Sequence, residues 1–204
     1  MFMHVPGLKV VAPTNAYDAK GCMISAIRDN NPVMFVEHRL LYSTDAPVPE
    51  DPYTVDFGKA RVSGDGTDIT LVGISYMLVE CLAARDLLAE VGISAEVIDP
   101  VSLMPLDVDT IANAAQRTGK MLVVDNAWTT AGASAEIIAA VCEHDPGKPL
   151  SFGRMGYAPT TCPTTPELEK EFYPNAATIA AKAYAMVRPD EVAWAPDVEP
   201  TLPH

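Results

Sequence analysis

The chain has 204 residues and a formal net charge of −13, from 27 acidic and 14 basic side chains. A composition of 49% hydrophobic and 20% charged residues is typical of a globular protein and excludes extensive disorder. The acidic surplus would repel a polyphosphate backbone, which argues against a nucleic-acid partner. No apolar run reaches the roughly 20 residues of a membrane span, and the first residues lack a signal-peptide pattern. We therefore expect a cytoplasmic protein that binds no membrane.

The four cysteines are scattered along the chain and form neither a CxxC pair nor a cluster with histidine. They are Cys22, Cys81, Cys142 and Cys162. This spacing predicts free thiols and no zinc site. Cys81 and Cys142 fall at apolar positions of expected helices, where we expect each to be a small buried side chain.

The first 43 residues predict a βαβ fragment. Residues 8–12 form an apolar run typical of a buried strand, residues 15–28 predict a helix, and residues 32–37 predict a second strand. A lone parallel pair cannot close a sheet, so this fragment needs neighbours. Residues 44–57 carry three prolines and several acids, and predict a stiff linker or an extended surface segment.

Strands and helices alternate from residue 58 to residue 188. Strands are expected at 68–74, 95–98 and 121–125, and helices at 76–91, 107–117 and 133–142, with two more helices capped by Thr165 and Asn175. This alternation predicts an α/β fold with parallel strands joined by right-handed crossovers. Residues 189–204 form a Pro-rich acidic tail, either disordered or laid over a partner, and Trp194 favours the second interpretation.

Ser75 is the first candidate for chemistry. It follows an expected strand, as the nucleophile of an α/β-hydrolase does, but Met77 stands where the last glycine of that motif belongs. No acid and histidine follow in convincing positions, so we interpret Ser75 as a helix cap. The Gly64-Asp65-Gly66 stretch is no phosphate loop and is expected to turn a hairpin-like connection.

Polar residues also follow two expected strands. Glu37, His38 and Arg39 come after the second strand, and Asp125, Asn126 and Trp128 come after the strand at 121–125. Ligand sites of α/β proteins gather at such carboxyl ends, and a histidine beside a glutamate can act as an acid or base. The alternative, which we favour, is a solvated or interface salt-bridge cluster at a strand end. No complete catalytic set is visible, so no catalytic residue is assigned.

Several long runs carry a family resemblance. They are HVPGLKVVAP (4–13), DAKG (18–21), AIRDNNPVMFVEHRLLY (26–42), GKARV (58–62), GTDITLVGIS (66–75), EVIDPVSLMPLD (96–107) and VVDNAWTTAGASAEI (123–137). Together they resemble the β subunit of the decarboxylating component of 2-oxo acid dehydrogenase complexes, within the transketolase-like superfamily. The stretch after Phe152 is richer in Thr and Pro than is usual in that family, so the acid substrate is left unassigned.

The resemblance implies a domain organisation. Residues 1–43 would be the last part of a pyrimidine-binding domain, 44–57 the linker, 58–188 a transketolase C-terminal domain and 189–204 the tail. The C-terminal domain would be a three-layer αβα sandwich with a mostly parallel sheet. We expect the strands missing from the first domain to come from another polypeptide, or the chain to be truncated.

The resemblance also implies a cofactor and partners. Thiamine diphosphate and magnesium would belong to the assembled enzyme, while the family's activating glutamate and active-site histidine lie upstream of residue 4. We expect this chain alone to bind neither and to be inactive. Its partners would be further copies of itself, a chain with the rest of the pyrimidine-binding domain, or a diphosphate-binding α subunit. A stand-alone scaffolding module of the same fold is the alternative.

One metal site is carried over from the resemblance. Some family members bind a structural potassium ion through backbone oxygens in the loop that matches AIRDNNP. The corresponding residues here are Ala26, Asp29 and Asn31. An ordinary polar turn is the alternative.

Overall fold

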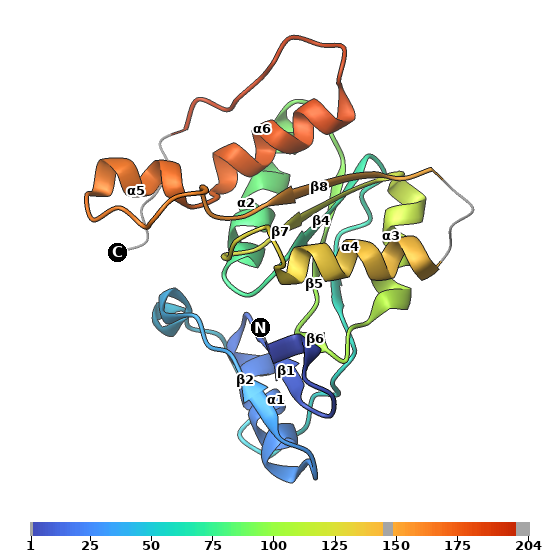
Figure 1. The fold of residues 1–204 in the computed structure, drawn as a ribbon, viewed down its shortest axis with the longest axis vertical. Coiled ribbons are helices and arrows are strands. Elements are labelled where there is room, and N and C mark those ends of the chain that lie inside the picture. The colour runs from blue at the N-terminus through green and yellow to red at the C-terminus, as the bar shows by residue number, and fades with distance from the viewer. Residues whose placement is uncertain (1, 145–148, 199–204) are drawn as a thin grey trace.

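A computed structural model describes residues 2–144 and 149–198. Its elements form a small unit near the N-terminus and a larger unit above it in Figure 1. The small unit contains the 3-10 helix η1 (Phe2–His4), β1 (Lys9–Val11), α1 (Ala16–Arg28), β2 (Val33–Phe35) and the 3-10 helix η2 (Arg39–Ser43). β1 and β2 are parallel, with Lys9 opposite Val33, so the predicted βαβ fragment is confirmed.

The small sheet has a third strand that the sequence pattern does not predict. β6 (Ser102–Met104) comes from the larger unit and pairs antiparallel with β1, which gives the order β2-β1-β6. Prolines at 100 and 105 flank this strand and hide it from a pattern search. The two units are therefore joined by a shared sheet as well as by the connecting chain.

The large sheet has the order β3-β5-β4-β7-β8. Its strands are β3 (Arg61–Ser63), β4 (Ile69–Gly73), β5 (Ala95–Asp99), β7 (Lys120–Val124) and β8 (Ser151–Met155). β4, β5, β7 and β8 are parallel, whereas β3 is antiparallel to β5 at one edge. Because β3 and β4 both pair with β5, the hairpin expected at Gly64-Asp65-Gly66 is wrong.

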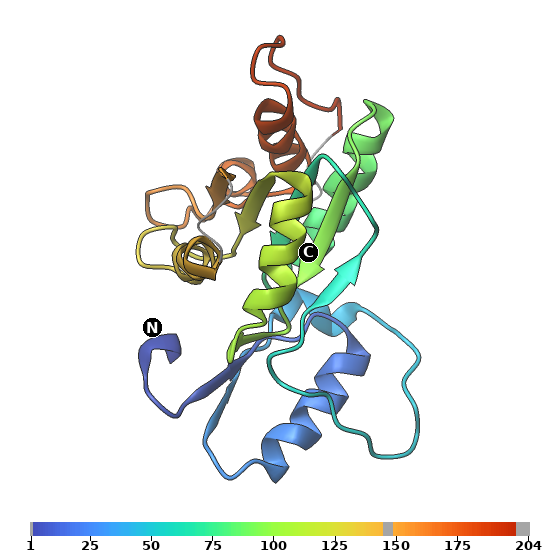
Figure 2. The same ribbon diagram turned by 90° about the vertical axis from the view of Figure 1, so that its right-hand side faces the viewer.

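Helices cover both faces of the large sheet (Figure 1, Figure 2). α2 (Met77–Glu90) and α6 (Ala176–Val187) pack on one face, α3 (Val108–Thr118) and α4 (Ala133–His144) on the other, and α5 (Pro166–Phe172) lies beside them. Alternate strand residues supply the two cores: Leu71 and Leu122 face α2 and α6, while Val72 and Val123 face α3 and α4. The three-layer αβα sandwich is confirmed.

The segment between the units is an extended strip that packs on α1. The ring of Tyr53 stacks on Tyr17 with centroids 4.5 Å apart, and the Ser25 hydroxyl donates to the carbonyl oxygen of Val55 over 2.7 Å. Val55 is buried. These contacts fix the path of the linker along the helix.

Two expectations about single residues fail. Cys81 is buried as expected, but Cys142 is exposed, because α4 buries Ser134, Ile137 and Val141 and so turns position 142 outward. Trp194 packs against Tyr184 of its own chain with ring centroids 5.1 Å apart. The described part of the tail thus covers α6 instead of a partner, and residues 199–204 lie outside the described residues. All four thiols are free.

Candidate functional site

Polar residues from both units meet at the carboxyl ends of four strands. Thr14 follows β1, His38 follows β2, Ser75 follows β4 and Asn126 follows β7. His38 Nε2 lies 2.7 Å from the Asn126 side-chain amide, and the Thr14 hydroxyl donates to the Ser75 carbonyl oxygen over 3.4 Å. Because ligand sites of open α/β sheets lie at these ends, this junction is the candidate functional site.

The His38 ring is held by three neighbours. It stacks on Tyr76 with centroids 5.0 Å apart, and the Leu40 N–H donates to Nδ1 over 3.4 Å. Burial lowers the pKa of His38, so its imidazole is neutral at pH 7. A neutral ring that accepts at Nδ1 donates from Nε2, which requires Asn126 to present its oxygen. The structure places Asn126 Nδ2 against His38 Nε2 and leaves Oδ1 without a hydrogen-bond partner among the described residues; turning the amide satisfies Oδ1.

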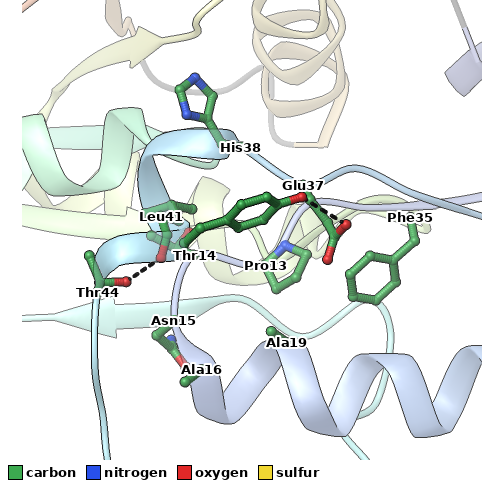
Figure 3. A pocket seen from close by; sticks show the side chains of 11 residues that line it. Pro13, Thr14, Asn15, Ala16, Ala19, Phe35, Glu37, His38, Leu41 and Thr44 are labelled. Atoms are coloured by element: carbon green, nitrogen blue, oxygen red, sulfur yellow. Dashed lines mark hydrogen bonds between the residues drawn. The ribbon is translucent and has the colours of Figure 1, made fainter. Parts of the chain in front are cut away.

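The predicted cluster at residues 37–39 does not form around His38. Glu37 accepts a hydrogen bond from the Tyr42 hydroxyl over 3.2 Å instead, and the side chains of Glu37 and His38 point in different directions (Figure 3). Within the described residues, Glu37 and His38 therefore do not pair with each other, and the solvated or interface salt-bridge cluster stays a prediction. Trp128, which was singled out with Asn126, lies more than half exposed on the loop after β7.

A pocket of about 100 Å³ lies beside this junction (Figure 3). It is formed by the start of α1, the end of β2 and η2, and is lined by Pro13, Thr14, Asn15, Ala16, Ala19, Phe35, Glu37, His38, Leu41, Tyr42 and Thr44. Sites for small organic ligands occupy roughly 300 to 1,000 Å³. This pocket is therefore too small to hold thiamine diphosphate, and the residues around it do not fit that cofactor.

Two buried acids stand at the same edge of the large sheet. Asp99 ends β5 and is 2% exposed; its Oδ1 accepts from the Val101 N–H over 2.9 Å, and its Oδ2 has no hydrogen-bond partner among the described residues. Burial raises the pKa of Asp99 to about 6, and it raises the pKa of Asp125 to about 6 as well. Among residues 2–144 and 149–198, no cluster of three or more His, Cys, Asp or Glu could hold a metal.

We expect the Asp99→Asn variant to be more stable than the unchanged protein at pH 8, by about 1 to 3 kcal/mol. The native carboxyl holds its proton up to about pH 6, whereas the unfolded carboxyl releases it near pH 3.8. The native state thus binds more protons in that window, and the free energy of unfolding contributed by Asp99 falls as pH rises through it. Urea unfolding at pH 4 and pH 8 measures the difference.

The matched control for this prediction is Asp65→Asn, which changes an exposed carboxyl. We expect most of the gain from Asp99→Asn to be lost at pH 4, where the native carboxyl is protonated and the unfolded carboxyl, with a pKa of 3.8, is close to half protonated. The control should gain nothing at pH 8. An equal gain for Asp99→Asn at both pH values would contradict the assigned cause.

Ser75 is neither a cap nor an activated nucleophile. α2 begins after Tyr76, and no side chain caps it, so the predicted helix cap is wrong. Ser75 has φ 54 and is buried, and its Oγ has no hydrogen-bond partner among the described residues. Both nitrogens of His38 are engaged elsewhere, by Asn126 and Leu40, so that ring does not act as its base.

One further contact fixes the small unit on the large one, and it was not predicted. Asp18 is buried at the start of α1 and accepts from Arg61 Nη2 over 2.5 Å and from Arg61 Nε over 3.3 Å. Within the large unit, Asp107, the confirmed cap of α3, also accepts from the Ala60 N–H over 3.0 Å. Sequence alone gives only a weak signal for such a contact. An acid in the first turn of a helix is also expected because it interacts favourably with the helix dipole.

The loop with the predicted potassium ligands is a compact turn. The Asp29 N–H donates to the Ala26 carbonyl oxygen over 3.3 Å, and the Asn31 N–H donates to Asp29 Oδ1 over 2.9 Å. The Asp29 carboxylate pairs with Lys9, and these hydrogen bonds lower its pKa. An ion here would depend on backbone oxygens, and the site stays a prediction.

Comparison with known proteins places two families along the chain. The family model described as "Transketolase, C-terminal domain" matches residues 58–179, and "Transketolase, pyrimidine binding domain" matches residues 1–44. Among solved structures, "Split gene transketolase, inactive beta4 tetramer" aligns with a TM-score of 0.75 at 22% identity, over 91% of this chain and 59% of that one. At that identity the likeness concerns the fold alone.

Curated relatives are β subunits. The chain is 42% identical over 184 residues to the β subunit of acetoin:2,6-dichlorophenolindophenol oxidoreductase from Cupriavidus necator, which covers 90% of this chain and 54% of the relative. It is 48% identical over 137 residues to the pyruvate dehydrogenase E1 component subunit β of Bacillus subtilis, which covers 67% and 42%. The chain thus spans about half the length of these relatives. With its αβα fold and a matched domain over more than half of its length, the chain belongs to the transketolase C-terminal domain family.

Proposed function

We propose that the chain is the C-terminal section of a thiamine-diphosphate-dependent β subunit, of the transketolase-like or 2-oxo acid dehydrogenase kind. It would provide subunit contacts and complete the enzyme with a partner that carries the catalytic glutamate. The observation that carries this proposal is the order of two matched families on one chain, pyrimidine-binding at 1–44 and C-terminal at 58–179. The β-subunit relatives support it.

The role of this chain's own residues would be to hold the pyrimidine-binding portion in place. Asp18 with Arg61, and His38 with Asn126, join the small unit to the large one by buried or half-buried polar contacts. Truncating one member of such a pair leaves the other without its partner, so these contacts favour one fixed arrangement. Positioning of this kind is what an enzyme assembled from several chains requires.

The cofactor would belong to the assembly. Thiamine diphosphate supplies an electron sink for the carbanion formed in decarboxylation, and the protein's task is to bind and orient it. The pocket described above is too small for it, so we propose that thiamine diphosphate and magnesium bind only when partner chains contribute their residues. Those partners would be a chain with the rest of the pyrimidine-binding domain and a diphosphate-binding α subunit, in a homo- or hetero-oligomer.

Several finer points belong to the same proposal. The domain limits would be 1–43, 44–57, 58–188 and 189–204, and a potassium ion would be held by backbone oxygens at Ala26, Asp29 and Asn31. We also propose that the protein works in the cytoplasm, because its four cysteines are free thiols, which suits a reducing compartment. Among the described residues, the helices are too short or too polar to span a bilayer.

Native mass spectrometry of the chain purified from its own cells, with thiamine diphosphate added, tests the proposal. We expect a copurifying polypeptide whose sequence carries pyrimidine-binding strands and the glutamate, and cofactor bound only to the complex. Decarboxylation of 2-oxo acids should need both chains. A self-associated species with neither partner nor cofactor would overturn the proposal and leave the scaffolding module.

A further inference from the structure

Glu37 is a carboxylate without a cationic partner in its own chain. It lies two residues beyond the end of β2, is exposed, and forms part of the wall of the small pocket beside the junction. Within residues 2–144 and 149–198, no lysine, arginine or histidine forms an ion pair with it, not even Arg39 two positions along the chain. A carboxylate in this situation can accept a charge-assisted hydrogen bond from outside the chain.

Tyr42 limits how a cation can approach this carboxylate. Its hydroxyl donates to Oε2 of Glu37 over 3.2 Å, whereas no hydrogen bond to Oε1 is formed within the described part of the chain. One carboxylate oxygen is therefore in use and the other is available. An arginine guanidinium prefers to bind both oxygens at once, whereas a lysine ammonium acts as a compact charge that needs one. The carboxylate of Glu37 is thus better suited to lysine.

The pocket beside Glu37 has room for an apolar stem. Phe35, Tyr42, Pro13 and Ala19 are among its lining residues, and Figure 3 shows the Glu37 carboxylate between the Tyr42 and Phe35 rings. Aromatic rings attract cations, and a lysine side chain lays its methylene groups along apolar surface while its charged end stays near water. A volume of about 100 Å³ is far below that of a site for a larger organic ligand and suits one side chain.

We infer that this pocket receives a lysine side chain from a basic partner polypeptide. The ammonium group pairs with Oε1 of Glu37, and the stem lies against Phe35 and Tyr42. A net charge of −13 favours a basic partner, and it makes two copies of this chain repel each other. The inference stands apart from the proposed function, because it concerns the chemistry of one contact and not the partner's activity.

NMR titration of the full-length, ¹⁵N-labelled chain tests the inference. The probe is Nα-acetyl-lysine amide, which carries the side chain and a peptide group on each side. We expect saturable shifts of the Ala16, Ala19 and Thr44 amide signals, which come from the pocket lining, with a Kd on the order of millimolar. The arginine derivative should bind about threefold more weakly or worse. The norleucine derivative has a stem without the charge and should give no saturable shift.

A charge-removing variant provides the second measurement. Glu37→Gln keeps the shape of the side chain, and we expect it to weaken binding of the lysine derivative about tenfold. The matched control is Glu50→Gln, which changes an exposed glutamate outside the pocket lining and should bind like the unchanged chain. The NMR spectra establish that both variants fold. The comparison of the three derivatives on the unchanged chain keeps the inference testable if Glu37→Gln does not fold.

Tyr42→Phe tests why the pocket prefers lysine. The variant keeps the ring and removes the hydroxyl that occupies Oε2 of Glu37. Both carboxylate oxygens then become available to an arginine, so we expect the arginine derivative to gain about threefold or more relative to the lysine derivative. A merely structural role for Tyr42 would change the binding of both derivatives by the same factor.

Four results would overturn the inference. Equal binding of the lysine and norleucine derivatives would show that the pocket takes any apolar side chain. Tighter binding of the arginine derivative by the unchanged chain would assign the pocket to arginine. Binding of n-butylammonium without binding of the lysine derivative would assign it to a free amine. The absence of saturable shifts with any probe would show that Glu37 is simply solvated. All four leave the proposed function standing, because copurification and cofactor binding test that separately.

Discussion

Replacing Arg117 with methionine is expected to lower the free energy of unfolding by about 3 kcal/mol, because it leaves a buried carboxylate without its ion-pair partner. Glu96 is the second residue of β5 and is 0% exposed. Its Oε2 accepts from Arg117 Nη2 over 2.7 Å, and its Oε1 accepts from the Thr70 hydroxyl over 3.1 Å. Methionine keeps an apolar stem of similar length and removes the guanidinium, with its charge and its hydrogen bond to Glu96. Urea unfolding followed by circular dichroism gives the difference.

An exposed ion pair supplies the control for this experiment. Arg85 pairs with Asp86 over 2.9 Å, and the Asp86 side chain is 72% exposed. Surface pairs are worth roughly 0 to 1 kcal/mol, so Arg85→Met should cost no more than that. Adding Glu96→Gln to Arg117→Met should recover part of the loss, because the buried charge is then gone. A cost below about 1 kcal/mol for Arg117→Met would show that water reaches Glu96.

Gly66→Ala is expected to lower the free energy of unfolding by about 4 kcal/mol or more. A Cβ at position 66 would lie 2.1 Å from the carbonyl carbon of Ala95 and 2.2 Å from the nitrogen of Glu96. Both atoms belong to the backbone of β5, which β3 and β4 hold on either side, so neither can move away cheaply. We expect little folded protein at 37 °C.

The control for Gly66→Ala separates steric conflict from backbone strain. Gly119 ends α3 with φ 72, and a Cβ there would meet nothing within 4 Å. Gly119→Ala should therefore cost about 1 kcal/mol, from the left-handed conformation alone. Thermal unfolding of both variants measures the contrast. Equal costs would mean that β5 shifts to accommodate the extra methyl group.

The helices of the large unit and its three central strands, β4, β5 and β7, could be predicted from sequence because these strands are mostly apolar. β4 and β7 are buried on both faces, and their pattern is correspondingly unbroken. β3, β6 and β8 escaped prediction: β3 and β6 have three residues each, and β8 contains Gly153 and Arg154, which interrupt its apolar run. These segments are strands because they pair with neighbouring strands, and their local sequence shows no strand preference.

The site was predictable in its parts but not as a whole. His38 and Asn126 could each be singled out, since each follows a strand of an α/β fold. Their contact depends on how the small unit docks against the large one, through Asp18 and Arg61. The burial of Asp99 likewise follows from that docking, so its raised pKa has no signature in the sequence.

The strand β1 has consequences for how the chain is made. It pairs with β2 shortly after in sequence, but its other neighbour, β6, is encoded far downstream in the larger unit. During synthesis one edge of β1 therefore stays unpaired until β6 has left the ribosome. Pairings between distant segments are slow to form and leave apolar strands exposed meanwhile. The nascent chain would thus be a natural client for chaperones that shield short apolar strands.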